Sequence, residues 1–216
     1  MLTRCLLFGF IYLTVSVQTE LNVEKPQCSR IKRNEIELHL STKTPYRVVA
    51  NSENKPIEYP GCKARRIWSV IRHGARNPSK KIIAKAQKEL VQLKKRILEN
   101  KNTMLCSDEL EKLKYWRCNT SVEEEKYLVA EGEDELIELA ERMQNRFPDI
   151  LPDTYDSDAY YFKYTATQRT LESARSFATG LFGRHRLRDI VYPEAMHRDP
   201  ILRCQNSVKC CGVPMF

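Results

Sequence analysis

The stretch of sequence that decides the fold is RIWSVIRHGARNP, residues 66–78. Its first part, residues 66–72, is rich in β-branched and aromatic side chains and predicts a buried strand. Gly74 and Pro78 then break this pattern and indicate a loop. Ligands of α/β proteins bind beyond the carboxyl ends of the strands. The sequence therefore predicts that this loop carries a binding site.

The loop combines the residue types that phosphoryl chemistry requires. A phosphate monoester carries about two negative charges near neutral pH, and a guanidinium group grips its oxygens in pairs. A neutral imidazole can attack phosphorus. His73, which lies between Arg72 and Arg76, would therefore face a phosphoryl group that these arginines hold and neutralise. Gly74 allows the backbone to turn tightly beside the ligand.

The next segment, residues 79–100, changes to a helical period. Its apolar face is formed by Ile82, Ile83, Ala86, Leu90, Leu93 and Ile97. The opposite face is rich in lysine. One interpretation is a solvated helix face, and the other is a basic wall that helps to hold a polyanionic substrate. Lys80 and Lys81 are the candidates for the second role because they are close to the loop.

Further elements follow in the order expected of an α/β protein. A short helix is predicted after Ser107, and Ser121 and Glu124 have the spacing of a capping box. A longer helix is predicted from about Gly132 to Pro148. Residues 160–165 alternate aromatic and polar side chains and predict a strand, and a helix follows Thr167. This order predicts an α/β fold with a helical insertion between its first two strands.

The motif Arg-His-Gly-x-Arg-x-Pro at residues 72–78 resembles the signature of the histidine acid phosphatases. The resemblance implies that His73 is the nucleophile, which is transiently phosphorylated, and that Arg72 and Arg76 clamp the phosphate. Residues 165–174, TATQRTLESA, are similar to the family segment that carries a third phosphate-binding arginine. This role therefore falls on Arg169.

Within that family the chain resembles the multiple inositol polyphosphate phosphatases, most clearly at residues 132–148, 173–181 and 197–203. The resemblance implies a phosphoglycerate mutase-like α/β core with a helical insertion, incomplete at the C-terminus. It implies a phytase-like phosphomonoesterase that uses a phosphohistidine intermediate and neither a cofactor nor a metal. Its substrates would be inositol hexakisphosphate, lower inositol polyphosphates and 2,3-bisphosphoglycerate.

These patterns divide the chain into five expected segments. They are a signal peptide (1–18), the N-terminal part of the phosphatase domain (19–78), a mainly helical insertion (79–150), a return to the α/β core (151–203) and an atypical Cys-rich tail (204–216). The signal peptide is expected because a short basic start precedes an apolar stretch that is too short to span a membrane comfortably. The mature chain is accordingly expected to contain no stable membrane span.

Export determines how the charge and the cysteines are interpreted. A net charge of +8 suits polyanionic partners, and export makes nucleic acid a poor one. The expected location is the secretory pathway, which includes the ER lumen, the cell surface and the extracellular space. Its oxidising conditions predict disulfides, and Cys106 could pair with Cys118. Asn119 begins a glycosylation sequon, which predicts a glycan on the surface.

Two departures from the family pattern leave alternatives open. The family carries a histidine followed by an acidic residue that protonates the leaving oxygen, and this chain has no corresponding pair. His197 is followed by Arg198 and Asp199, but Asp199 belongs to a different family segment. The alternative to an active enzyme is therefore a weak or inactive form that binds inositol phosphates. A third hypothesis, which ignores the signature, is a basic module that binds anionic glycans.

Overall fold

The computed structural model describes residues 33–51, 53, 55–197 and 199–202. The predicted signal peptide and the Cys-rich tail lie outside these residues. Within the described ranges, no helix combines the length and the apolar character needed to cross a bilayer.

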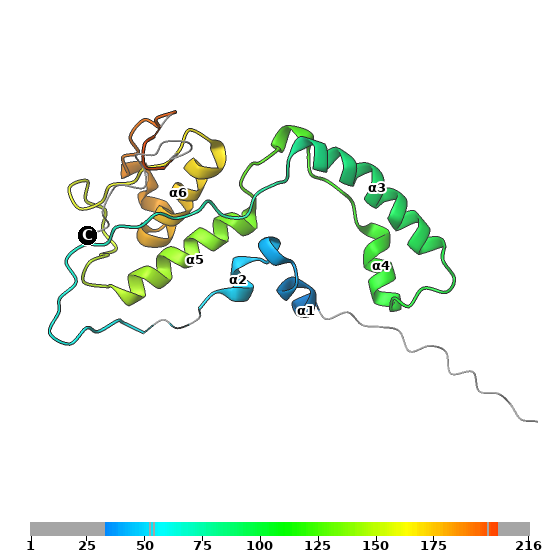
Figure 1. Ribbon diagram of the computed structural model, residues 1–216, viewed down its shortest axis with the longest axis horizontal. Helices are drawn as coiled ribbons and strands as arrows, with labels where there is room; N and C mark the ends of the chain where they lie inside the picture. Colours follow the sequence, from blue (N-terminus) through cyan, green and yellow to red (C-terminus); the bar gives the residue numbers. More distant parts are fainter. Residues whose placement is uncertain (1–32, 52, 54, 198, 203–216) are drawn as a thin grey trace, which may run out of the picture.

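The regular structure of the described residues consists of helices and short 3-10 turns. In chain order these are α1 (Arg33–Leu38), η1 (Ser41–Lys43), α2 (Tyr46–Val49), α3 (Lys80–Glu99), α4 (Ser107–Tyr115), η2 (Val122–Glu124), α5 (Ala130–Arg146), α6 (Gln168–Phe182) and η3 (Arg184–Asp189). Helices α5 and α6 pack against each other, whereas α3 and α4 form a separate arm (Figure 1).

The helix predicted over residues 79–100 is confirmed as α3, but its apolar face is only partly covered. Ile83 is buried at 1% exposure, whereas Leu90 and Leu93 keep 42% and 44% of their surface. The arm explains this difference, because α3 packs mainly on the short elements η2 and α4 among the described helices and lies away from α5 and α6 (Figure 1). The short helix predicted after Ser107 is confirmed as α4.

The two longer predictions around the core are confirmed as α5 and α6. Helix α5 ends at Arg146, just before Pro148. Helix α6 begins after Thr167, which lies at its N-cap. It ends at Gly183, whose φ of 80° is in the left-handed region that glycine adopts without strain.

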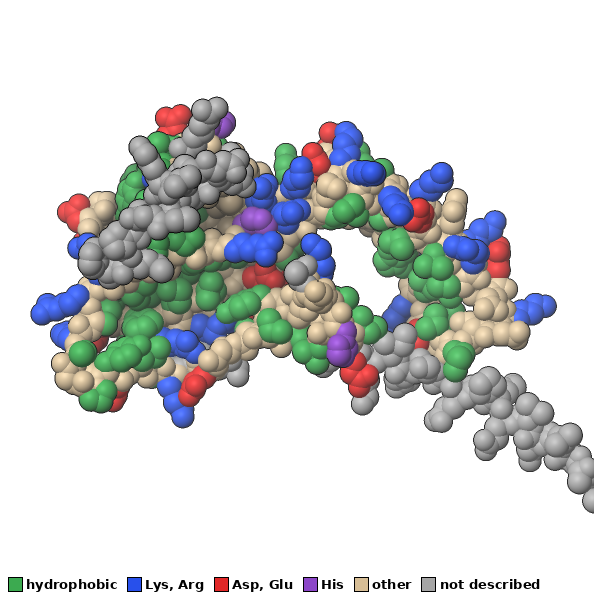
Figure 2. Space-filling view, in the orientation of Figure 1, with side chains coloured by type: hydrophobic (Ala, Val, Ile, Leu, Met, Phe, Trp, Pro, Cys, Tyr) green, Lys and Arg blue, Asp and Glu red, His purple; other side chains and the backbone are tan. Residues whose placement is uncertain are grey.

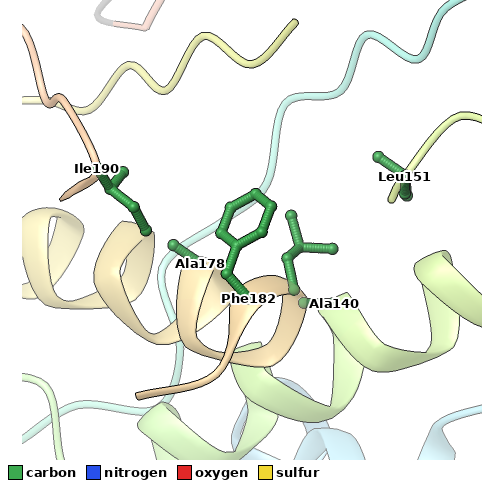
Figure 3. Packing of buried hydrophobic residues seen from close by; sticks show 6 residues of the cluster. Ala140, Leu151, Ala178, Phe182 and Ile190 are labelled. Carbon is green, nitrogen blue, oxygen red and sulfur yellow. The ribbon is translucent and has the colours of Figure 1, made fainter. Parts of the chain in front are cut away.

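The core lies between α5, α6 and the segments that follow each of them. Its buried residues are Ala140, Leu151, Ala178, Leu181, Phe182 and Ile190 (Figure 3). The ring of Phe182 packs edge-on against Tyr160, with 4.9 Å between their centroids. Such edge-to-face pairs add about 0.5–1.5 kcal/mol to the effect of burial alone. This packing fixes α6, which carries Arg169, relative to residues 160–162.

The two strand predictions are wrong for the described residues. Segments 66–72 and 160–165 are irregular, and an isolated antiparallel bridge between Arg76 and Leu128 is the β pairing found in the described part of the chain. A strand exists only where a neighbouring backbone pairs with it, and within the described residues no backbone hydrogen bond joins these two segments. Trp68 is 72% exposed, so the first segment is not buried either.

The alternation that suggested the second strand is nevertheless visible over residues 160–162. Tyr160 and Phe162 pack against the core, whereas Tyr161 is exposed at 75%. These side chains therefore point alternately inward and outward, as the sequence pattern predicts, although the backbone is unpaired.

The proposed pairing of Cys106 with Cys118 is also wrong. Cys118 is a free thiol, as is Cys62. The pairing was predicted because the two cysteines are close in sequence, but helix α4 lies between them.

Candidate active site

The loop of residues 73–78 is held along its C-terminal half by the segment that precedes α5. The amide of Val129 donates to the Ala75 carbonyl (3.1 Å), and the amide of Asn77 donates to the Tyr127 carbonyl (2.9 Å). These bonds flank the bridge between Arg76 and Leu128. The loop therefore lies against the N-terminal end of α5.

Two glycines allow this contact to be close. A Cβ atom at Gly74 would lie 2.7 Å from the backbone carbonyl carbon of Gly132, and a Cβ atom at Gly132 would lie 2.6 Å from the amide nitrogen of Ala75. Real Cβ atoms essentially never approach other atoms this closely. Glycine is thus required on both sides of the contact, which supports the predicted role of Gly74 in a close approach of the backbone.

Helices α5 and α6 also bind the loop amides through side chains. The amide of Gly74 donates to Ser173 Oγ on α6 (3.1 Å), and the amide of Ala75 donates to Glu135 Oε2 on α5 (2.7 Å). These partners lie 99 and 60 residues away along the chain. Because both amides are directed at helices, neither of them is available to bind a ligand.

The imidazole of His73 is oriented by its own loop. Its Nδ1 lies 2.8 Å from the Gly74 carbonyl oxygen. A carbonyl oxygen can only accept a hydrogen bond, so Nδ1 is the nitrogen that carries the proton. In the neutral ring, Nε2 then keeps its lone pair, which is the form that a nucleophile requires.

The surroundings of His73 favour this neutral form. Burial lowers the pKa of His73 below its usual value, and the guanidinium groups of Arg169, Arg76 and Arg72 lower it further, while the bond to Gly74 opposes them. A lowered pKa means that, at any given pH, a larger fraction of this ring is neutral than in an unperturbed histidine. The positive charges that would bind a phosphate therefore act together with burial to favour the unprotonated imidazole of His73.

His73 opens onto a pocket of about 600 Å³. This volume is within the range of about 300–1,000 Å³ that is typical of small-molecule sites. The pocket is lined by residues 69–73, residues 162–165, Leu136, Leu202 and the α6 residues Arg169, Thr170, Ser173, Ala174 and Phe177. Among the lining residues Arg72, Arg169 and Lys163 are cationic, and none is Asp or Glu.

The structure brings together some of the predicted site residues and not others. Arg72, His73 and Arg169 line one pocket, although they come from positions almost 100 residues apart. Arg76 lies next to it and acts on His73 through its charge, but its Nη1 donates to the Asn77 carbonyl (2.9 Å).

Three other predicted residues lie outside the pocket lining. Lys80 Nζ is 3.6 Å from Glu123, and Lys81 is exposed on the first turn of α3. The space-filling view shows lysine and arginine side chains spread along this arm (Figure 2). Asn119 is exposed after α4, where a glycan can be accommodated. No group of three metal-binding side chains is found in the ranges that the structure describes.

Sequence reasoning missed the ion pair of Lys163 and Asp199. Lys163 Nζ lies 2.7 Å from Asp199 Oδ2, and the Asp199 side chain is fully buried. The hydrogen bond from Lys163 lowers the pKa of Asp199, and two backbone amides, those of Ile201 and Leu202, also donate to its carboxylate. The aromatic-polar alternation of residues 160–165 marked Lys163 as a polar position, but nothing in the sequence indicated its partner.

The influence of Arg169 on His73 gives the first testable prediction. Arg169→Gln removes a positive charge, so we expect the pKa of His73 to rise toward its usual value of 6.5. The shift is measured by NMR titration of the His73 ring. Arg175→Gln is the matched control, because Arg175 is exposed on the same helix and pairs with Glu172. Equal titration curves for the two variants would contradict the assignment.

Comparison with known proteins identifies the family of this chain. Residues 65–210 match the histidine phosphatase superfamily (branch 2), and the chain belongs to that family. It is similar to multiple inositol polyphosphate phosphatase 1 of Drosophila melanogaster, with 36% identity over 154 residues. The match covers 66% of this chain and 33% of the relative, so the chain spans about a third of that protein's length. No solved structure matches the chain.

Proposed function

We propose that this protein is a phosphomonoesterase that acts on inositol polyphosphates through a phosphohistidine at His73. The observation that carries the proposal is the pocket in which His73 lies with Arg72 and Arg169. The arginines would bind the phosphate oxygens while Nε2 attacks phosphorus. The N–P bond forms, the ester P–O bond breaks, and the alcohol oxygen takes a proton. Water then hydrolyses the phosphohistidine to imidazole and inorganic phosphate.

Two observations support an inositol polyphosphate as the substrate: the positive charge of the pocket lining and the similarity of the chain to the relative named above. Lys163, which is paired with Asp199, is a third cationic lining residue of the pocket, and the relative named above acts on such substrates according to its name. A substrate with several phosphate groups could contact more than one of these cations at once. Inositol hexakisphosphate, lower inositol polyphosphates and 2,3-bisphosphoglycerate share this multiple charge. We assign substrate contacts to Arg169 and Arg76, and we keep Lys80 and Lys81, which lie outside the pocket lining, as candidates for contact with a substrate that extends beyond it.

A second candidate function is a binding form that does not turn over. The observation that favours it is the lining of the pocket, in which none of the described residues is a carboxylic acid. A positioned general acid typically contributes about a hundred- to ten-thousand-fold to such a reaction. Without one, the leaving oxygen takes its proton from water. The protein would then bind inositol phosphates and react slowly.

One experiment tests both candidates. The 216-residue protein is mixed with ³²P-labelled inositol hexakisphosphate, quenched in alkali and examined for phosphohistidine, while phosphate release is followed in parallel. Labelling with steady release supports the phosphatase. Binding by calorimetry with neither label nor release supports the binding form. If no inositol phosphate binds at all, both candidates are wrong.

We also propose that the protein enters the secretory pathway and carries a glycan on Asn119. The exposure of Asn119 supports this proposal, as does the apolar N-terminal sequence. The expected α/β core, with residues 79–150 as a helical insertion, remains part of the same proposal. It is supported by membership of the family and by the separate arm of α3 and α4.

A further inference from the structure

Glu135 binds two segments that lie far apart in the sequence. Its Oε2 accepts a hydrogen bond from the amide of Ala75 in the nucleophile loop (2.7 Å). Its Oε1 accepts one from the amide of Tyr46, the first residue of α2 (3.1 Å). One carboxylate on α5 therefore joins the loop and the N-terminal segment. Hydrogen bonds to an ionised acceptor are about twice as strong as neutral ones.

Helix α2 is itself bound to α5. The Tyr46 amide that donates to Glu135 is therefore held in place. Arg47 Nε lies 2.7 Å from Glu131, one turn before Glu135. The same guanidinium donates to both carboxylate oxygens of Glu37 in α1, at 2.8 and 2.7 Å. The guanidinium of Arg142 lies 5.2 Å from the centroid of the Tyr46 ring. Helices α1 and α2 thus brace the α5 face that contacts the loop.

The position of the Ala75 amide decides where the imidazole points. Ala75 is two residues after His73, and Gly74, which lies between them, accepts the Nδ1 hydrogen bond. The close contact with Gly132 leaves no room for Gly74 to move toward α5. If the Ala75 amide lost its acceptor, the Gly74–Ala75 peptide could rotate, and the carbonyl that orients His73 would rotate with it.

We propose that Glu135 is a positioning residue for the His73 nucleophile, with α1 and α2 as its brace. This inference rests on the proposed phosphohistidine function. Glu135 is absent from the residues that line the pocket, so it acts through the loop and does not touch the substrate. Misplacing a reacting group by about 1 Å can cost on the order of a hundred-fold in rate.

Two substitutions at Glu135 distinguish the role of its acceptor oxygens from the role of its negative charge. Glu135→Leu removes both acceptor oxygens at a similar side-chain size. Glu135→Gln keeps one carbonyl oxygen for the Ala75 amide, but its NH₂ group can only donate and cannot accept from Tyr46. Glu133→Gln is the matched control, because Glu133 lies on the same helix, is exposed and undergoes the same change of charge.

The readout is the rate of His73 phosphorylation at saturating inositol hexakisphosphate, with the dissociation constant measured in parallel. We expect Glu135→Leu to slow phosphorylation about ten- to hundred-fold and to change the dissociation constant less than about three-fold, because Arg169 is held on α6. Glu135→Gln should restore most of the rate. Thermal unfolding of each variant shows whether it is folded. Equal rates in Glu135→Leu and Glu133→Gln would overturn the proposal, as would equal losses in Glu135→Leu and Glu135→Gln.

A second measurement keeps the inference separate from the proposed function. Amide hydrogen exchange at Ala75 is read by NMR without substrate, and we expect faster exchange in Glu135→Leu than in Glu135→Gln or Glu133→Gln. If the wild-type protein forms no phosphohistidine, the proposed function is wrong, and exchange at Ala75 still decides whether Glu135 holds the loop. Unchanged exchange in Glu135→Leu would show that it does not.

Discussion

His73→Ala is expected to reduce phosphohistidine formation by more than about a thousand-fold, since removal of a catalytic nucleophile leaves only residual catalysis. No other imidazole among the described residues lines the pocket, and the Nδ1 bond to Gly74 leaves Nε2 of His73 as the nitrogen with a free lone pair. The measurement is ³²P incorporation from labelled inositol hexakisphosphate, followed by identification of the labelled residue.

In His73→Ala, substrate binding should change much less than phosphohistidine formation. Arg72 and Arg169 still line the pocket, so the dissociation constant for inositol hexakisphosphate should change by less than about ten-fold. His185→Ala is the matched control, because His185 is exposed in η3 and lies outside the pocket lining. Label that persists in His73→Ala, or disappears equally in His185→Ala, would refute the assignment of the nucleophile.

Gly132→Ala is expected to destabilise the protein and to displace the loop that carries His73. The new Cβ would lie 2.6 Å from the Ala75 amide nitrogen and 2.9 Å from Leu128 Cδ1. Alanine is favoured over glycine within a helix by about 1 kcal/mol. Overpacking typically costs about 1–3 kcal/mol and sometimes more, and this contact is with backbone that cannot easily move aside. We therefore expect a net loss of about 1–2 kcal/mol in the free energy of unfolding.

The effect on chemistry should exceed the effect on stability. The displaced atoms belong to the peptide that orients His73, so phosphohistidine formation should fall even at temperatures where the variant remains folded. Urea unfolding gives the first quantity and ³²P labelling the second. Glu133→Ala, an exposed change on the same turn, should leave both near the wild-type values. A Gly132→Ala protein as stable and as readily labelled as the wild type would show that the loop does not need this contact.

The sequence was most informative where function depends on neighbouring residues. The motif at residues 72–78 located the loop, and the likeness at residues 165–174 added Arg169, which the structure places in the same pocket. Lys80 and Lys81 were chosen because they are close to the loop in sequence. The helix that carries them extends into the arm, however, so proximity along the chain did not bring them into the lining.

The helices were predicted well because their signals are local, whereas the strands were not. The spacing of apolar residues marks α5 and α6, and Pro148 and Gly183 mark their C-terminal ends. Both helices can therefore be recognised from their own stretch of sequence. A strand depends on a partner elsewhere in the chain, so the alternation of residues 160–165 could predict which side chains point inward but not whether the backbone is paired. Glu135 and Ser173 were missed for the same reason, because their partners lie 60 and 99 residues away.

The separation of those hydrogen bonds along the chain has a consequence for the order of folding. Closing loops of 60 and 99 residues is entropically costly, and such contacts form after nearby ones. Contacts between α5 and α6 join residues that are closer in sequence, so they are expected to form before the loop amides reach the carboxylate and the hydroxyl. The imidazole of His73 would then acquire its orientation only after the two helices have docked.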